Sequence, residues 1–306
     1  MQRPALGAFD PVGVTREDEK PTPTPRHELR QRLISAAVLI TVSVAATTLS
    51  AWSFALLVTG IAIVLSWEWE RLIAPSETSA ETSVSDQSGR LTALRGVAVF
   101  AGAVAIAGGS GAAGALVVAA ALVATIALGA GTRRGWQVLG TAYIVAPALA
   151  LIALRCAPDH GLSAILFVFA VVWGADSGAF VFGRFLGGPR AFPSISPNKT
   201  WAGNLGGLLA GLWVGVAAAS LLGAPLMCEL GAIGMLLACL TLAGDYAESA
   251  LKRHFGAKDV SGLIPGHGGF LDRVDGLVIA ALGAFIIGAS FNPANPAHGL
   301  LRLAGA

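Results

Sequence analysis

Charged residues are scarce in this chain. Of its 306 residues only 12% are charged, whereas 55% are hydrophobic, and the mean hydropathy is +0.71. The surface of a soluble protein usually needs about twice this fraction of charged residues. The composition therefore excludes an ordinary soluble domain. The net charge of +2 says little by itself, and we expect no nucleic-acid partner.

Cysteine is also rare, and the N-terminus lacks the pattern of a signal peptide. Cys156, Cys228 and Cys239 form no Cys-x-x-Cys pair and lie in or beside apolar segments. They therefore indicate small packing residues, and neither a disulfide framework nor a zinc site is expected. Residues 1–32 are polar, rich in proline and without the apolar core of a signal peptide. We predict that residues 1–32 are a disordered cytoplasmic tail.

What the chain has in abundance is long uncharged runs. A bilayer core about 30 Å thick is spanned by about 20 apolar residues in a helix. The runs 33–67 and 96–132 are too long for one span, so we divide them near Ser50–Trp52 and at the glycine-rich stretch 108–111. The other predicted spans are about 136–154, 162–183, 204–224, 228–244 and 275–291. The predicted fold class is all-α, a polytopic integral membrane protein with about nine transmembrane helices.

The distribution of basic residues predicts the orientation of the spans. Cytoplasmic loops collect Lys and Arg, and of the 20 such residues in the chain all but Arg155 and Arg302 fall on one side of the alternating spans. Arg95 is counted here in the loop after the second span. We predict that the N-terminus and the active site lie at the cytoplasmic face of the plasma (inner) membrane. Spans one to five form an N-terminal region, 33–155, and the remaining spans form a catalytic region, 156–306.

One acidic residue lies inside a predicted span. Asp176 has no charged neighbour between Phe167 and Gly183. An ionisable side chain inside a span is energetically costly and is by default a functional-site hypothesis. The alternative is a structural aspartate that accepts hydrogen bonds from helix ends near Gly174 and Gly178.

The densest group of polar residues lies between the last two predicted spans. Five carboxylates and four basic groups gather there: Asp245, Glu248, Asp259, Asp272 and Asp275, with Lys252, Arg253, Lys258 and Arg273. If the eighth span continues as a helix, Asp245, Glu248 and Lys252 share one of its faces. Oxygen donors without cysteine favour Mg²⁺ over zinc, and the interleaved cations suit phosphate oxygens. The segment therefore predicts metal-assisted phosphoryl or nucleotidyl transfer, with a solvated loop as the alternative.

Three segments together resemble one family. The stretch from Ser249 to Asp275, SALKRHFGAKDVSGLIPGHGGFLDRVD, is similar to the signature of the phosphatidate cytidylyltransferase (CDP-diacylglycerol synthase) family. Ala175–Ala179 and the Ser196–Thr200 loop also resemble this family, in the right order, so the resemblance covers roughly 165–290. The N-terminal half matches only in being hydrophobic. Ala202 departs from the pattern, because relatives commonly carry Glu or Gln there, which puts a side-chain contact of that loop in doubt.

The resemblance implies the reaction CTP + phosphatidate → CDP-diacylglycerol + pyrophosphate, in the phospholipid biosynthesis of a lipid bilayer. It also implies a required divalent metal, Mg²⁺, and allows a second, monovalent cation such as K⁺. Asp245 and Asp272 match the family's metal-ligand aspartates, and Asp275 and Asp176 follow as further candidate ligands. The candidate catalytic residues are Lys252, Lys258, His267 and Arg273, and the candidate substrate-binding residues are Ser196, Lys199, Thr200 and Arg253.

Such a reaction needs no serine or cysteine nucleophile. A phosphatidate phosphate has a second pKa of about 6 and is mostly a dianion at neutral pH, so it can attack the α-phosphorus of CTP directly. Two alternatives stay open. A secondary transporter or channel would place its charged residues near the membrane midplane, whereas here all but Asp176 are predicted in loops on one side. A lipid-alcohol kinase, or a transferase for another isoprenoid lipid, is the nearer alternative. A homodimer is an open alternative to a monomer.

Overall fold

A computed structural model describes residues 25–74, 81–129, 131–225, 227–257, 260–264 and 268–302, and for 25–33 and 81–85 it describes the backbone alone. The long helices are α1 (Pro25–Leu49), α2 (Ala51–Leu72), α3 (Glu81–Ala107), α4 (Gly111–Leu128), α5 (Arg134–Cys156), α6 (Gly161–Phe185), α7 (Trp201–Leu222), α8 (Met227–His254) and α9 (Leu271–Phe291). A 3₁₀ turn, η1 (Gly131–Arg133), precedes α5, and a short helix, α10 (Pro296–Leu301), follows α9. The β-structure in these residues is limited to two isolated bridges, so the all-α fold class is confirmed.

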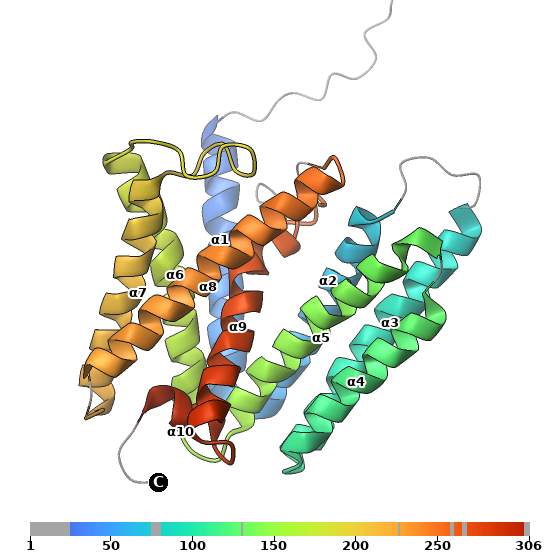
Figure 1. Cartoon of the computed structure of the whole chain (residues 1–306), viewed down its shortest axis with the longest axis horizontal. Helices are drawn as coiled ribbons and strands as arrows, with labels where there is room; N and C mark the ends of the chain where they lie inside the picture. Colours follow the sequence, from blue (N-terminus) through green and yellow to red (C-terminus); the bar gives the residue numbers. More distant parts are fainter. Residues whose placement is uncertain are drawn as a thin grey trace, which may run out of the picture.

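The helices have the dimensions of membrane spans. By length and composition, eight of the described helices, α2 to α9, are long and apolar enough to cross a membrane. The apolar part of α1, Ile34–Leu49, is shorter. Successive helices run in opposite directions, so that α2, α6 and α8 end, and α3, α5 and α7 begin, at the upper end of Figure 1. The helices therefore alternate in direction as the predicted spans do, whereas the predicted count of about nine spans and the compartment that this end faces stay predictions.

Both predicted divisions of the long apolar runs are confirmed. Ser50 follows α1 and caps α2: its hydroxyl accepts the Ser53 N–H at 2.9 Å, and the Ser53 hydroxyl accepts the Ser50 N–H at 3.0 Å. This reciprocal capping box satisfies two N–H groups that have no partner within the helix. The second division lies at Gly109, whose φ of 87° is in the left-handed region that glycine adopts without strain.

Two predicted boundaries are wrong. Helix α1 begins at Pro25, inside the segment predicted as a tail, and residues 1–24 lie outside the described residues. Arg95 is part of α3 and not of a loop: its side chain is 0% exposed, and Nη2 lies 2.9 Å from Glu70 Oε1. Charges at the end of an apolar run predict a loop, but pairing within the protein interior allows the helices to continue through them.

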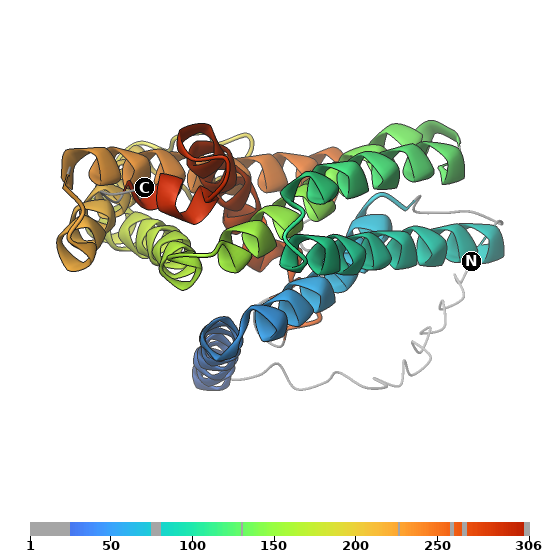
Figure 2. The ribbon, with the colours of Figure 1, turned by 90° about the horizontal axis from the view of Figure 1, so that it is seen from below.

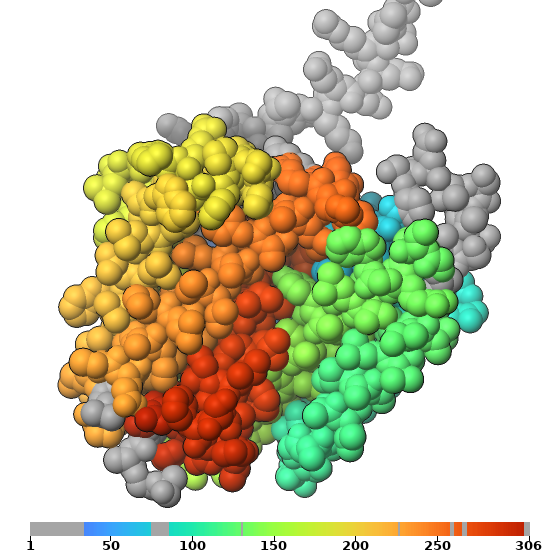
Figure 3. All heavy atoms as spheres, viewed as in Figure 1, coloured from blue at the N-terminus to red at the C-terminus, as the bar shows by residue number. Residues whose placement is uncertain are grey.

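The helices form two groups that meet at α5 and α9. In Figure 2, α2 to α5 lie on one side and α6 to α10 on the other, and α5 packs against α9 between them. Helix α1 lies at the edge, in contact with α2 and α6. Figure 3 shows α8 and α9 in the middle of one face, with the connection from α6 to α7 at the upper left, beside α8.

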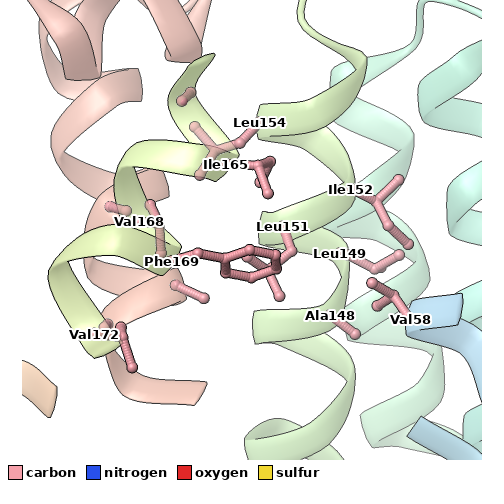
Figure 4. Close-up of a cluster of buried hydrophobic side chains, with 14 of the residues drawn as sticks. Val58, Ala148, Leu149, Leu151, Ile152, Leu154, Ile165, Val168, Phe169 and Val172 are labelled. Carbon is pink, nitrogen blue, oxygen red and sulfur yellow. The ribbon is translucent and has the colours of Figure 1, made fainter. Parts of the chain in front are cut away.

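Small residues and interdigitating side chains hold these helices together. A Cβ atom on Gly211 of α7 would lie 2.6 Å from the Gly234 carbonyl oxygen of α8, so only glycine allows this backbone approach. Close packing of this kind drives helix association in lipid, where no hydrophobic force acts between helices. Larger side chains fill the boundary between α5 and α6, where Phe169 points toward Leu151 (Figure 4) and both are buried.

Candidate active site

A polar cavity of about 690 Å³ lies where α6, α7, α8 and α9 meet below the α6–α7 connection. Its charged lining residues are Asp176, Arg184, Lys199, Asp245, Glu248, Lys252, Asp272, Arg273 and Asp275. Ser196, Asn198, Thr200, Asn204 and Ser249 add hydroxyl and amide groups. Hydrogen-bonding groups of both charge signs therefore line a cavity of a size typical for small ligands.

Helix geometry brings the α8 residues into this cavity. Helix α8 continues past the uncharged run as far as His254, so Asp245, Glu248 and Lys252 lie on one face, as predicted, and all three line the cavity. Helix α9 begins at Leu271 with Asp272 in its first turn. The carboxylate is favoured there because the N-terminal end of a helix carries partial positive charge.

Lys252 joins α8 to α9. Its ammonium nitrogen lies 2.9 Å from Glu248 Oε1 and 2.5 Å from Asp272 Oδ1. The other oxygen of Asp272 accepts the Gly269 N–H at 3.0 Å. The side chains of Glu248 and Asp272 are only 2% and 7% exposed, so this ion pair is screened little by solvent. The last turns of α8 and the first turn of α9 are thus held at a fixed separation.

Lys199 makes the corresponding contact from the α6–α7 connection. Its ammonium group forms an ion pair with the Asp245 carboxylate and lies 4.3 Å from the centroid of the Tyr246 ring. The next residue, Thr200, caps α7 by accepting the Gly203 N–H at 3.1 Å. Because Thr200 is the N-cap of α7, Lys199 lies directly before this helix, and its side chain contacts α8.

An amide and a phenol that the sequence did not suggest also belong to this region. Asn204 lines the cavity, and its amide hydrogen-bonds the Tyr246 hydroxyl at 3.0 and 3.1 Å. Phe192 packs edge-on against the Tyr246 ring, with 5.1 Å between centroids. The sequence does contain a signal for Asn204, because this amide stands in an otherwise apolar run.

A second, apolar cavity of about 280 Å³ adjoins the first. Side chains from α1, α2, α5, α6 and α9 line it, among them Leu39, Val58, Ala148, Val172 and Leu277. Asp176 and Arg273 line both cavities. The sequence did not predict this cavity, because its wall comes from five helices spread along the chain.

The structure gathers nine of the twelve predicted site residues around the polar cavity: Asp176, Ser196, Lys199, Thr200, Asp245, Lys252, Asp272, Arg273 and Asp275. Arg253 is not brought there, because its exposed side chain lies in the last turn of α8, outside the lining. Lys258 and His267 lie outside the described residues. The structure therefore brings most of the predicted residues to one cavity, whereas their catalytic, substrate-binding and metal-binding roles stay predictions.

The donor set of the polar cavity fits a hard divalent cation. The described lining holds five carboxylates but four cationic side chains, which leaves an excess of oxygen donors. No group of three or more Asp, Glu, His or Cys side chains in the described part of the chain forms a ready cage for a metal ion. Mg²⁺ is usually held by one or two carboxylates together with substrate phosphates, so these donors fit it without such a cage.

Comparison with known proteins identifies the family. The family model described as the cytidylyltransferase family matches residues 30–291. The chain belongs to the cytidylyltransferase family. A phosphatidate cytidylyltransferase of Brucella melitensis is 39% identical over 265 residues, which cover 86% of this chain and 94% of that protein. The family match extends through the N-terminal half, so the predicted limits of the resemblance, roughly 165–290, are too narrow.

Two further relatives of this family member carry the same name. The phosphatidate cytidylyltransferase of Haemophilus influenzae is 41% identical over 128 residues, or 40% of this chain and 44% of that protein. The one from Staphylococcus saprophyticus is 44% identical over 118 residues, or 38% of this chain and 45% of that protein.

Proposed function

We propose that this protein transfers the cytidylyl group of CTP to phosphatidate and releases pyrophosphate, giving CDP-diacylglycerol for membrane phospholipid biosynthesis. The observation that carries the proposal is the pair of cavities in a member of the cytidylyltransferase family. One cavity is polar, the other is apolar, and Asp176 and Arg273 line both. One substrate of the proposed reaction is a polyanion, and the other combines a phosphate with two acyl chains.

The shared residues suggest how phosphatidate lies. Its acyl chains would occupy the apolar cavity, and its phosphate would lie at the boundary, where the Arg273 guanidinium can donate two parallel hydrogen bonds to phosphate oxygens. The triphosphate of CTP would occupy the polar cavity near Lys199, Lys252 and the hydroxyls of Ser196 and Thr200. This arrangement brings the two phosphate groups together at the boundary between the cavities.

The transfer step then follows from charge and position. An oxygen of the phosphatidate phosphate forms a bond to the α-phosphorus of CTP, and the bond from that phosphorus to the bridging oxygen of the β-phosphate breaks. The bonding electrons leave with pyrophosphate. Because the nucleophile is already an anion, the protein contributes positioning and neutralisation of repelling charges, which dominate phosphoryl transfer.

We also propose Mg²⁺ as the cofactor. Asp245 and Asp272 would hold it, with Asp275 and Asp176 as additional ligands, and a monovalent cation such as K⁺ would be its neighbour. The excess of carboxylates in the described lining supports this, because such a lining repels two polyanionic substrates unless a cation is added. When bound, Mg²⁺ supplies positive charge to the phosphate oxygens as they approach and as pyrophosphate leaves.

For the orientation we propose that the end of the bundle with the polar cavity faces the cytoplasm across the plasma (inner) membrane. The basic residues near this end support it. Single cysteines placed at Arg133 and Ala257 should react with an impermeant maleimide only from the cytoplasmic side, and one at Asp159 only from the opposite side. Reaction of the first two from opposite sides would overturn the proposed topology.

The choice of acceptor lipid tests the proposed activity. Purified protein in lipid nanodiscs would receive CTP labelled with radioactive phosphorus at both the α and the γ position. Phosphatidate, diacylglycerol or a polyprenol would be the sole acceptor. We expect a labelled lipid with phosphatidate alone. Labelling of diacylglycerol or a polyprenol would favour a lipid-alcohol kinase or an isoprenoid-lipid transferase, and binding without turnover would favour a transporter.

A further inference from the structure

Glu68, near the C-terminal end of α2, is a buried carboxylate that binds the beginning of α9. Its exposed fraction is 0%. Oε1 accepts the Phe270 N–H at 2.8 Å, and Oε2 accepts the Leu271 N–H at 2.6 Å. The Ser261 hydroxyl forms a further hydrogen bond with Oε1. One side chain of the N-terminal half thus takes part in three hydrogen bonds with Ser261 and the beginning of α9.

These contacts replace a cap that α9 lacks. The first N–H groups of a helix have no partner within the helix, and a polar side chain at the N-cap position usually accepts one of them. The N-cap residue of α9 is Phe270, and it makes no such hydrogen bond. Glu68 supplies the acceptor from another helix, and its negative charge also matches the positive end of the α9 dipole.

The capped turn carries a residue of the polar cavity. Asp272 follows Leu271 directly, and its Oδ2 accepts the Gly269 N–H at 3.0 Å while Oδ1 contacts Lys252 at 2.5 Å. Glu68 and Asp272 therefore hold adjacent N–H groups of the same turn. Glu68 itself does not line the polar cavity, so any influence on the reaction passes through α9.

We propose that Glu68 is a positioning residue for the transfer reaction. It fixes the first turn of α9 against α2, which keeps the Asp272 carboxylate in reach of Lys252 and aimed into the polar cavity. This inference rests on the proposed function. It gives the N-terminal helices a role in the site beyond enclosing the lipid, because α2 sets the position of a residue on α9.

The substitution Glu68→Gln tests this role with little change in shape. A glutamine offers one acceptor oxygen and turns its NH₂ group toward a backbone N–H, which leaves one donor of Phe270 or Leu271 unpaired. We expect kcat per folded molecule to fall about tenfold or more, as for residues that orient metal ligands. The KM for CTP should stay within about threefold, because Lys199, Ser196 and Thr200 are unchanged. The matched control is Ser66→Ala, since Ser66 is buried on the same helix and, among the described residues, its hydroxyl bonds only the Ala62 carbonyl.

Amide hydrogen exchange adds a readout that needs no activity. In Glu68→Gln the amides of 268–275 should exchange faster, whereas those in the middle of α8 and all amides of Ser66→Ala should match the wild type. Should Glu68→Gln fail to fold, Ser261→Ala takes its place, with an expected two- to fivefold loss of kcat, about 1 kcal/mol or less by the usual conversion.

The outcomes separate this inference from the proposed function. An inactive wild-type protein, in nanodiscs with CTP and phosphatidate, contradicts the proposed function and leaves the exchange measurement to decide the capping role. An active wild type together with a folded Glu68→Gln variant of unchanged kcat overturns the positioning role. A loss of kcat that Ser66→Ala shares in equal measure overturns it as well.

Discussion

The ammonium nitrogen of Lys252 lies 2.5 Å from Asp272 Oδ1, so one cation of α8 holds a carboxylate of α9. Lys199 forms the corresponding ion pair with Asp245. Both aspartates proposed to hold Mg²⁺ therefore have a lysine as counter-ion. We expect these lysines to exchange carboxylate for phosphate oxygens when nucleotide and metal enter together, because the metal then neutralises the carboxylates.

Loss of either aspartate should abolish activity. Asp245→Asn and Asp272→Asn each remove a proposed metal ligand, and several kcal/mol of lost transition-state stabilisation correspond to a factor of ten for each ~1.4 kcal/mol. Turnover and Mn²⁺ binding, followed by electron paramagnetic resonance, would both be measured on protein that inserts normally. The control is Asp86→Asn, whose exposed side chain pairs with Arg90. More than a tenth of wild-type activity in either variant, at saturating Mg²⁺, would contradict the assignment.

A charge-preserving change at Lys252 should also be harmful. The ammonium group fits between Glu248 and Asp272 as a compact charge, whereas a planar guanidinium is larger and would displace one of them. We expect Lys252→Arg to insert normally, to lose most of its turnover and to bind CTP more weakly. Lys258→Arg is expected to behave in the same way. The control Arg90→Lys changes an exposed cation and should leave the rate unchanged. Near-wild-type turnover of Lys252→Arg would instead make Lys252 a topological anchor only.

A bulky residue in the apolar cavity should affect the lipid substrate alone. Ser43 of α1 lines this cavity, so Ser43→Trp should raise the KM for long-chain phosphatidate about tenfold and leave the KM for CTP unchanged. Dioctanoyl phosphatidate should be affected less, because its chains need less of the cavity. Val42→Trp is the control, since Val42 is 47% exposed and does not line the cavity. Equal KM values for long-chain phosphatidate in both variants would rule out this cavity as the acyl site.

The buried ion pair of Arg95 and Glu70 should stabilise the folded protein. The Arg95 side chain also donates to the Thr141 hydroxyl at 3.0 Å and to the Gln137 carbonyl at 2.9 Å. Arg95→Met leaves the Glu70 carboxylate buried without its cation, which typically costs about 3–5 kcal/mol. Thermal unfolding in detergent should show this loss, and the double variant Arg95→Met/Glu70→Met should recover most of it. An Arg95→Met variant as stable as the wild type would contradict the role of the pair.

Local patterns in the sequence predict the helices and much of the grouping of residues around the polar cavity. An uncharged run defines each apolar helix, and the serines at 50 and 53 mark a break that hydropathy alone does not show. The helical period placed Asp245, Glu248 and Lys252 on one face. These features depend on neighbouring residues only, so a single sequence contains them.

Contacts between distant segments could not be predicted in this way. Glu68 bonds the N–H of Leu271, which is 203 residues further along the chain, and nothing near Glu68 in the sequence indicates that partner. The sequence predicts a loop at Arg95 because an isolated charge is normally costly within a span. Its partner Glu70 is evident only when α2 and α3 are packed together. The apolar cavity was missed for the same reason.

The fate of each phosphate of CTP tests the proposed reaction most directly. CTP labelled with radioactive phosphorus at the α position, and separately at the γ position, would be incubated with phosphatidate and wild-type protein in nanodiscs, with Asp272→Asn as the inactive control. Cytidylyl transfer predicts that the α label appears in the lipid and the γ label in pyrophosphate, in equal amounts. Appearance of the γ label in the lipid, or of no label in either product, would contradict it.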